Sequence, residues 1–170
     1  VERDVVLEGG SVDSDGGGTC LTTASCLLHG NRGAVGGRPR SRAVMEGVLG
    51  ESLGVERVVW LPGGIGGDDT DGHVDDVARF LRAGLVAAVE ARPGHPDAST
   101  TGANVRALES SGLGVVRLPA PEPRVWTGSR WARAGDSGTG PGDAVPASYA
   151  NFLLVNGVLL LPVFGDRADD

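Results

Sequence analysis

Lysine is missing from this sequence. All 15 cationic side chains of the 170 residues are therefore arginines, and 22 acids give a formal net charge of −7. A chain of this charge repels phosphate backbones, which argues against nucleic-acid binding. A small cationic partner suits the negative field better.

Cysteine is scarce as well. Cys20 and Cys26 lack the spacing of metal ligands and are too few for a disulfide framework, which predicts a reducing, cytoplasmic environment. No export signal opens the chain, and its longest apolar run, 152–164, is interrupted by Asn156-Gly157 and Pro162, so no membrane contact is expected.

The remaining composition is that of one modest globular domain, with 40% apolar and 22% charged residues. The first residue is Val1 rather than methionine, and the acidic segment 165–170 resembles a helix start with no helix after it. We therefore expect a fragment of a longer protein.

Local patterns predict a ββαβ unit in the first third of the chain. Residues 11–14 and 19–23 flank a glycine-rich turn, which predicts a hairpin. Ser41 can begin a helix that Gly54 ends, and residues 57–61 form a β-branched run that ends at Pro62.

The same order recurs further along the chain. A second hairpin is expected at 80–81 and 85–89, a helix at 104–111 and a strand at 114–118, although periodicity alone would also allow a helix at 74–81. This strand ends at a proline 57 residues after Pro62, which indicates an internal repeat.

A third unit is predicted to begin near the end of the chain. Residues 120–146 look irregular, and 149–155 and 158–161 then flank Asn156-Gly157, a strong hairpin signal. Two units and the opening of another suggest part of a radial array of small sheets.

The chemistry is expected in the acidic centre, residues 68–76, where five aspartates surround His73. Aspartates can stabilise a metal or a guanidinium, and histidine exchanges protons near neutral pH. On an extended segment His73 and Asp75 would face the same side and meet one ligand. The alternative is a histidine that merely bonds a loop carboxylate.

Other motifs in the chain are weaker. Residues 69–75 superficially resemble a calcium loop, but the glycine comes too early and no glutamate closes the loop, so no metal site is predicted. The glycine-rich segment 63–67 lacks the Gly-Lys-Ser/Thr sequence that ends a phosphate-binding loop, so it is interpreted as a spacer. His29 and His95 stand alone and are assigned structural roles.

Ten short segments of the sequence follow one another in an order typical of a known family. They are 7–11, 15–16, 18–19, 27–28, 31–32, 60–62, 68–75, 78–80, 148–152 and 162–166. Together they resemble the agmatine deiminase family, the Porphyromonas-type peptidyl-arginine deiminases of the pentein superfamily. The resemblance runs from about Val5 to Asp170 and corresponds to the middle of a complete family member.

The resemblance implies a fold and an arrangement of units. The fold is the pentein-type α/β propeller of five ββαβ modules around a central active site, of which about half is present. Residues 1–170 would then form a partial domain, with module 1 at 5–62, module 2 at 75–119 and the start of module 3 at 147–170.

The resemblance also implies site roles. His73 matches the general acid/base, Asp75 matches a carboxylate that grips the substrate guanidinium, and Glu8 matches the glutamate that orients the histidine. The family's nucleophilic cysteine and a further aspartate belong to segments that this sequence lacks, and neither Cys20 nor Cys26 matches a catalytic position.

The predicted function is that of a cofactor-free hydrolase. The complete enzyme would convert agmatine and water to N-carbamoylputrescine and ammonia, a step of putrescine and polyamine metabolism, while this chain alone is expected to be inactive. The alternatives are a peptidyl-arginine deiminase and a non-catalytic module that binds a guanidinium or another cation. A homo-oligomer is left open.

Overall fold

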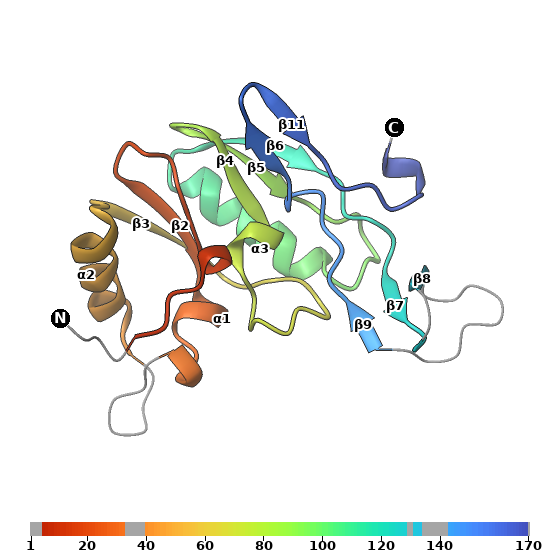
Figure 1. The fold of residues 1–170 in the computed structure, drawn as a ribbon, viewed down its shortest axis with the longest axis horizontal. Helices are drawn as coiled ribbons and strands as arrows, with labels where there is room; N and C mark the ends of the chain where they lie inside the picture. The colour runs from red at the N-terminus through yellow and green to blue at the C-terminus, as the bar shows by residue number, and fades with distance from the viewer. Residues whose placement is uncertain (1–4, 33–39, 129–130, 134–142, 170) are drawn as a thin grey trace.

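The computed structural model describes residues 5–32, 40–128, 131–133 and 143–169, and it has a mixed α/β fold. Figure 1 shows two three-stranded sheets side by side, with one long helix against each. A smaller sheet and a hairpin follow in the last third of the chain (Figure 1).

The first sheet has the order β1-β2-β3. Its first two strands are antiparallel and the third is parallel to the second. The strands are β1 (Val12–Ser14), β2 (Thr19–Thr23) and β3 (Arg57–Leu61). The crossover between the parallel strands holds α1 (Ala24–Leu27), the 3-10 turn η2 (Gly30–Arg32) and α2 (Arg42–Leu53).

Helix α2 begins and ends at the residues that the sequence predicts. The Ser41 hydroxyl accepts a hydrogen bond from the Val44 amide at 3.4 Å, and Gly54 adopts a left-handed conformation with φ of 70°. A side-chain cap satisfies an amide that the first turn leaves open, and glycine enters the left-handed region without a Cβ penalty.

The second sheet repeats this topology in the order β4-β5-β6. Strands β4 (Ala78–Arg82) and β5 (Leu85–Val89) are antiparallel, and β6 (Gly114–Leu118) is parallel to β5. The predicted strand–helix order is thus present twice. The helix that periodicity allowed at 74–81 is wrong, because the 3-10 turn η3 (Val74–Asp76) leads there into β4.

Helix α3 (Ala98–Ser110) begins six residues before the predicted start at 104. Its first turns contain poor helix formers, which local propensity undervalues. Tertiary contacts hold them instead: the buried Thr101 hydroxyl accepts from the Ala91 amide at 3.1 Å, and the Asn104 side chain donates to the Gly63 carbonyl at 2.8 Å.

The stretch 120–146 is not wholly irregular, as the sequence had suggested. Three short strands lie there in the order β8-β7-β9, namely β7 (Arg124–Trp126), β8 (Trp131–Arg133) and β9 (Asp143–Val145). The sequence of these strands has little apolar alternation, so it does not predict them. They are defined by their pairing with one another. The predicted hairpin is confirmed as β10 (Leu153–Val155) and β11 (Val158–Leu160), and a 3-10 turn, η4 (Arg167–Asp169), follows.

One aliphatic core joins the two repeated units. It contains Leu21 and Leu61 from the first sheet and Val86 from the second, and α3 packs against β3 as well as β5 and β6. A separate cluster under α2 contains Cys20, Cys26 and Met45. The ring of five modules and the boundaries at 5–62, 75–119 and 147–170 stay predictions.

Within the described residues, no helix is both long and apolar enough to cross a bilayer.

Candidate active site

Glu8 lies just before the 3-10 turn η1 (Gly9–Ser11), which leads into β1. Its backbone is extended, and its carbonyl accepts from both the amide and the hydroxyl of Ser11, at 3.0 and 2.6 Å. The Thr22 hydroxyl of β2 in turn donates to the Ser11 carbonyl at 2.8 Å. The sheet therefore fixes the position from which the Glu8 side chain extends.

His73 comes from the loop that joins the two repeated units. Its amide donates to Asp68 Oδ2 at 2.9 Å and to the Thr70 hydroxyl at 3.2 Å. The next residue, Val74, is fully buried and begins η3. The backbone of His73 is thus fixed by its own amide and by the buried residue that follows it.

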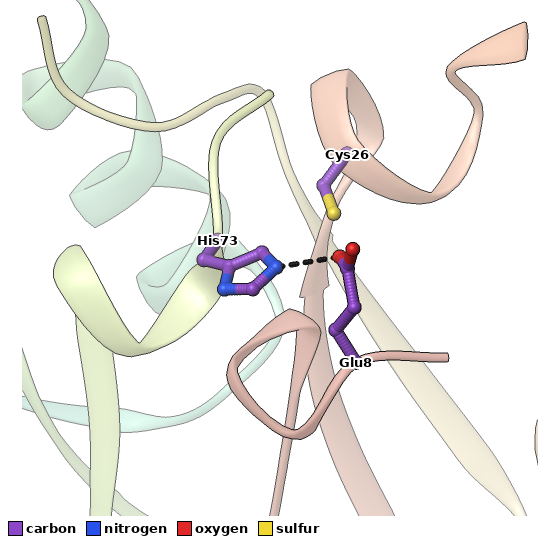
Figure 2. Close-up of side chains that lie close together, drawn as sticks. All are labelled: Glu8, Cys26 and His73. Atoms are coloured by element: carbon purple, nitrogen blue, oxygen red, sulfur yellow. Dashed lines mark hydrogen bonds and ion pairs between the residues drawn. The ribbon is translucent and has the colours of Figure 1, made fainter. Parts of the chain in front are cut away.

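The two side chains meet although 65 residues separate them. His73 Nε2 and Glu8 Oε2 are 2.7 Å apart (Figure 2). This hydrogen bond is the main cause of the lowered pKa of Glu8, and a hydrogen bond from Arg32 is the second cause. This is the contact that the resemblance implied, while the chemical roles of the two residues stay predictions.

Asp75 lies beside the other ring nitrogen, with Oδ1 4.0 Å from His73 Nδ1. The extended segment expected here is wrong, since η3 begins at Val74. The tight turn nevertheless places the side chains of His73 and Asp75 beside each other. Burial raises the pKa of Asp75, and the nearby His73 opposes that effect.

Gly10 faces both of these side chains. A Cβ atom at Gly10 would lie 2.5 Å from His73 Nδ1 and 2.7 Å from Asp75 Oδ2, closer than atoms of side chains approach. At the neighbouring Gly9, by contrast, a Cβ would meet nothing within 4 Å. Glycine at position 10 therefore leaves the space that the imidazole and the carboxylate occupy.

Arg32 is the residue that sequence reasoning missed. Its side chain is only 4% exposed, and it donates to Glu8 Oε2 from Nε at 3.0 Å and from Nη2 at 2.6 Å. It also donates to Asp71 Oδ2 and the Thr70 carbonyl, each at 2.6 Å. The only signal for Arg32 in the sequence was the match of Asn31-Arg32 to the family motif, and that match did not indicate what Arg32 does.

Part of the acidic centre therefore holds a guanidinium of the chain itself. Asp71 also accepts from Asn31 at 2.7 Å, and Asp68 binds loop groups. His29 lies 3.5 Å from the Asp71 carboxylate, on the surface. His95 is buried and its Nε2 lies 3.1 Å from the Pro121 carbonyl, a contact that agrees with the structural role predicted for it.

Cys26 of α1 is the second residue whose place the sequence did not indicate. It is buried, and one ligand atom from each of Glu8, Cys26 and His73 lies within 4.8 Å of the others. This is the one such three-residue group of possible metal ligands among the described residues. Burial, opposed by Arg32 and supported by nearby carboxylates, raises the pKa of the Cys26 thiol to about 11.

The arrangement suits proton transfer beside a bound cation. An imidazole with a carboxylate at each nitrogen can gain or lose a proton while its orientation is fixed. Asp75, with a quarter of its side chain exposed, is available to pair with a guanidinium or an ammonium.

Comparison with known proteins gives consistent matches. A family model described as Porphyromonas-type peptidyl-arginine deiminase matches residues 1–170. The agmatine deiminase of Pseudomonas savastanoi pv. phaseolicola is 37% identical over 182 residues, which cover 100% of this chain and 48% of that protein. The agmatine deiminase of Medicago truncatula is 38% identical over 186 residues, which cover 99% of this chain and 47% of that protein.

A solved structure agrees with these matches. The agmatine deiminase of Enterococcus faecalis superposes with a TM-score of 0.80 at 36% identity, over 99% of this chain and 48% of that one. This chain thus spans about half the length of the curated relatives it matches.

Proposed function

Because the chain belongs to the Porphyromonas-type peptidyl-arginine deiminase family, we propose that it is part of an agmatine deiminase-like hydrolase. The complete enzyme would convert agmatine and water to N-carbamoylputrescine and ammonia. The observation that carries the proposal is the position of His73, which lies 2.7 Å from the Glu8 carboxylate and 4.0 Å from that of Asp75.

In this proposal Asp75 binds the substrate guanidinium. A bidentate, charge-assisted pair contributes about 1.5–3 kcal/mol per hydrogen bond and aligns the guanidinium carbon for attack. The carboxylate must be ionised to do so, and burial raises its pKa. Guanidinium binding should therefore weaken on acidification at a higher pH than for an ordinary aspartate.

His73 is the proposed general acid and base. A cysteine thiolate attacks the guanidinium carbon, and the imidazolium protonates the departing ammonia. The neutral imidazole then takes a proton from water, which attacks the same carbon and releases the ureido product and the thiol. Glu8 holds the ring through Nε2 and stabilises its charged form.

The nucleophile is assigned to sequence beyond these 170 residues. Cys20 and Cys26 are both buried, and burial raises the pKa of each thiol to about 11. A catalytic thiol needs the opposite, a pKa lowered by cations or a helix end. The chain by itself is therefore proposed to be inactive.

Variants of a family-length protein that contains this chain test the proposal. His73→Asn should lower the rate of ammonia release from agmatine at least about a hundredfold, the low end for a general acid/base, while calorimetry still detects agmatine binding. Asp75→Asn should mainly weaken binding. Asp69→Asn is the control, since Asp69 is an exposed aspartate of the same loop.

The two alternatives predict other outcomes. A peptidyl-arginine deiminase would turn over an arginine-containing peptide and leave agmatine unchanged. A non-catalytic module would bind agmatine without releasing ammonia. The assignment is wrong if His73→Asn loses all binding while Asp75→Asn loses none.

A further inference from the structure

Glu8, Cys26 and His73 converge from three separate parts of the chain. Figure 2 shows the Cys26 sulfur directed toward the Glu8 carboxylate and the imidazole. One ligand atom from each lies within 4.8 Å of the others. Ligands of a tetrahedral zinc ion, at about 2.0–2.3 Å from the metal, are roughly 3.3–3.8 Å apart, so shifts of about 1 Å would complete the geometry.

The donor set is selective. Thiolate, imidazole and carboxylate are together the ligands of Zn²⁺ and of Co²⁺ used in its place, whereas Ca²⁺ and Mg²⁺ prefer oxygen alone. Of the calcium-loop pattern at 69–75, only His73 belongs to this group of described residues, and none of its aspartates does.

The surroundings of Cys26 also disfavour a bare thiolate. Burial raises the pKa of the thiol most, the Arg32 guanidinium opposes that effect, and the carboxylates of Glu8, Asp71 and Asp68 add to it. A divalent metal that replaces the thiol proton supplies the positive charge that a buried thiolate needs.

The ligands are already held by their neighbours. Arg32 fixes Glu8 through Oε2, and the His73 amide is bound by Asp68. The hydrogen bonds that the Glu8 carboxylate makes with Arg32 and His73 all fall on Oε2, so Oε1 can turn to a metal. Such outer contacts orient metal ligands and raise affinity.

We propose that Glu8, Cys26 and His73 bind a thiophilic divalent cation of the Zn²⁺ class, with the fourth coordination position open. The metal takes the place of the Cys26 thiol proton, which leaves to solvent, and it binds the neutral imidazole at Nε2 while the one ring proton is on Nδ1, the nitrogen nearer Asp75. A metal on His73 Nε2 would block the proton transfer assigned to this residue, so the site is inhibitory if the proposed function holds.

The test uses this chain, freed of metal with a chelator, and Co²⁺ as the probe. Binding should produce a near-ultraviolet thiolate-to-cobalt absorption band. Cys26→Ser should abolish the band and weaken Zn²⁺ binding, measured by calorimetry, at least about tenfold. The control is Cys20→Ser, which removes the other buried thiol of the same core and should keep the band.

A second measurement needs no variant. Zn²⁺ should slow the alkylation of Cys26 and leave that of Cys20 unchanged, as read by mass spectrometry of peptides. Absence of the cobalt band, or equal protection of both thiols, overturns the proposal. Neither readout involves agmatine, so failure of the deiminase assignment and failure of the metal site are separate results.

Discussion

Arg32 donates two hydrogen bonds to a single carboxylate oxygen of Glu8, from Nε at 3.0 Å and from Nη2 at 2.6 Å. The same oxygen lies 2.7 Å from His73 Nε2. A buried guanidinium therefore holds the carboxylate that contacts the imidazole. It also joins the loop before β1 to the loop before η3 through its bond to Asp71.

Replacing Arg32 should destabilise the chain. Arg32→Met would leave Glu8 and Asp71 without their cation, at a cost of about 2–3 kcal/mol in the free energy of unfolding by urea. Arg92→Met is the matched control, because the Arg92–Glu122 pair is exposed and such pairs contribute less than about 1 kcal/mol. Equal costs for the two variants would contradict the bridging role.

The contacts of Glu8 should make the free energy of unfolding depend on pH. The hydrogen bonds from His73 and Arg32 lower the pKa of Glu8 below its ordinary 4.5, so their stabilisation is complete above that pH and is lost as the pH falls through the folded value. The difference in unfolding free energy between wild type and Glu8→Gln should therefore be largest at neutral pH and shrink below about 4.5. A difference that grows on acidification would refute this.

The glycine pair before β1 allows a steric test of the site. Gly10→Ala places a methyl group 2.5 Å from His73 Nδ1, whereas Gly9→Ala meets nothing within 4 Å. Only the first should move the His73 ring resonances in an NMR spectrum and, in a family-length protein, lower turnover. Similar shifts from both alanines would show that the space at Gly10 is not needed.

The hairpin β10–β11 should cause self-association. Its six residues are 41 to 55% exposed although all of them are leucine or valine. Apolar strands of this kind at an open edge tend to pair with another chain. Serine at both Leu154 and Leu159, a cross-strand pair, should reduce the sedimenting mass toward 17.3 kDa.

A single exposed valine on α2 supplies the control for that experiment. Val44→Ser removes a side chain that is exposed to a similar degree but lies outside the hairpin, so it should leave the sedimentation profile unchanged. A wild-type chain that sediments as a monomer would contradict the prediction.

Local signals in the sequence determined much of the secondary structure. Ser41 and Gly54 set the ends of α2, and the strands at 57–61 and 114–118 were predicted with the bounds that the structure has. Asn156 and Gly157 both adopt positive φ in the β10–β11 turn, as the sequence pair favours. Each of these features depends on the backbone preferences of a few neighbouring residues.

The site depended on contacts that no short stretch encodes. The acidic centre itself pointed to His73 and Asp75, and the resemblance to a family added Glu8, but neither Arg32 nor Cys26 could be placed beside them from spacing. Arg32 meets Asp71 across 39 residues, and Cys26 lies near His73 although the two are far apart in the sequence. Only tertiary packing decides which distant charges are buried together, because that choice depends on how the whole chain excludes water.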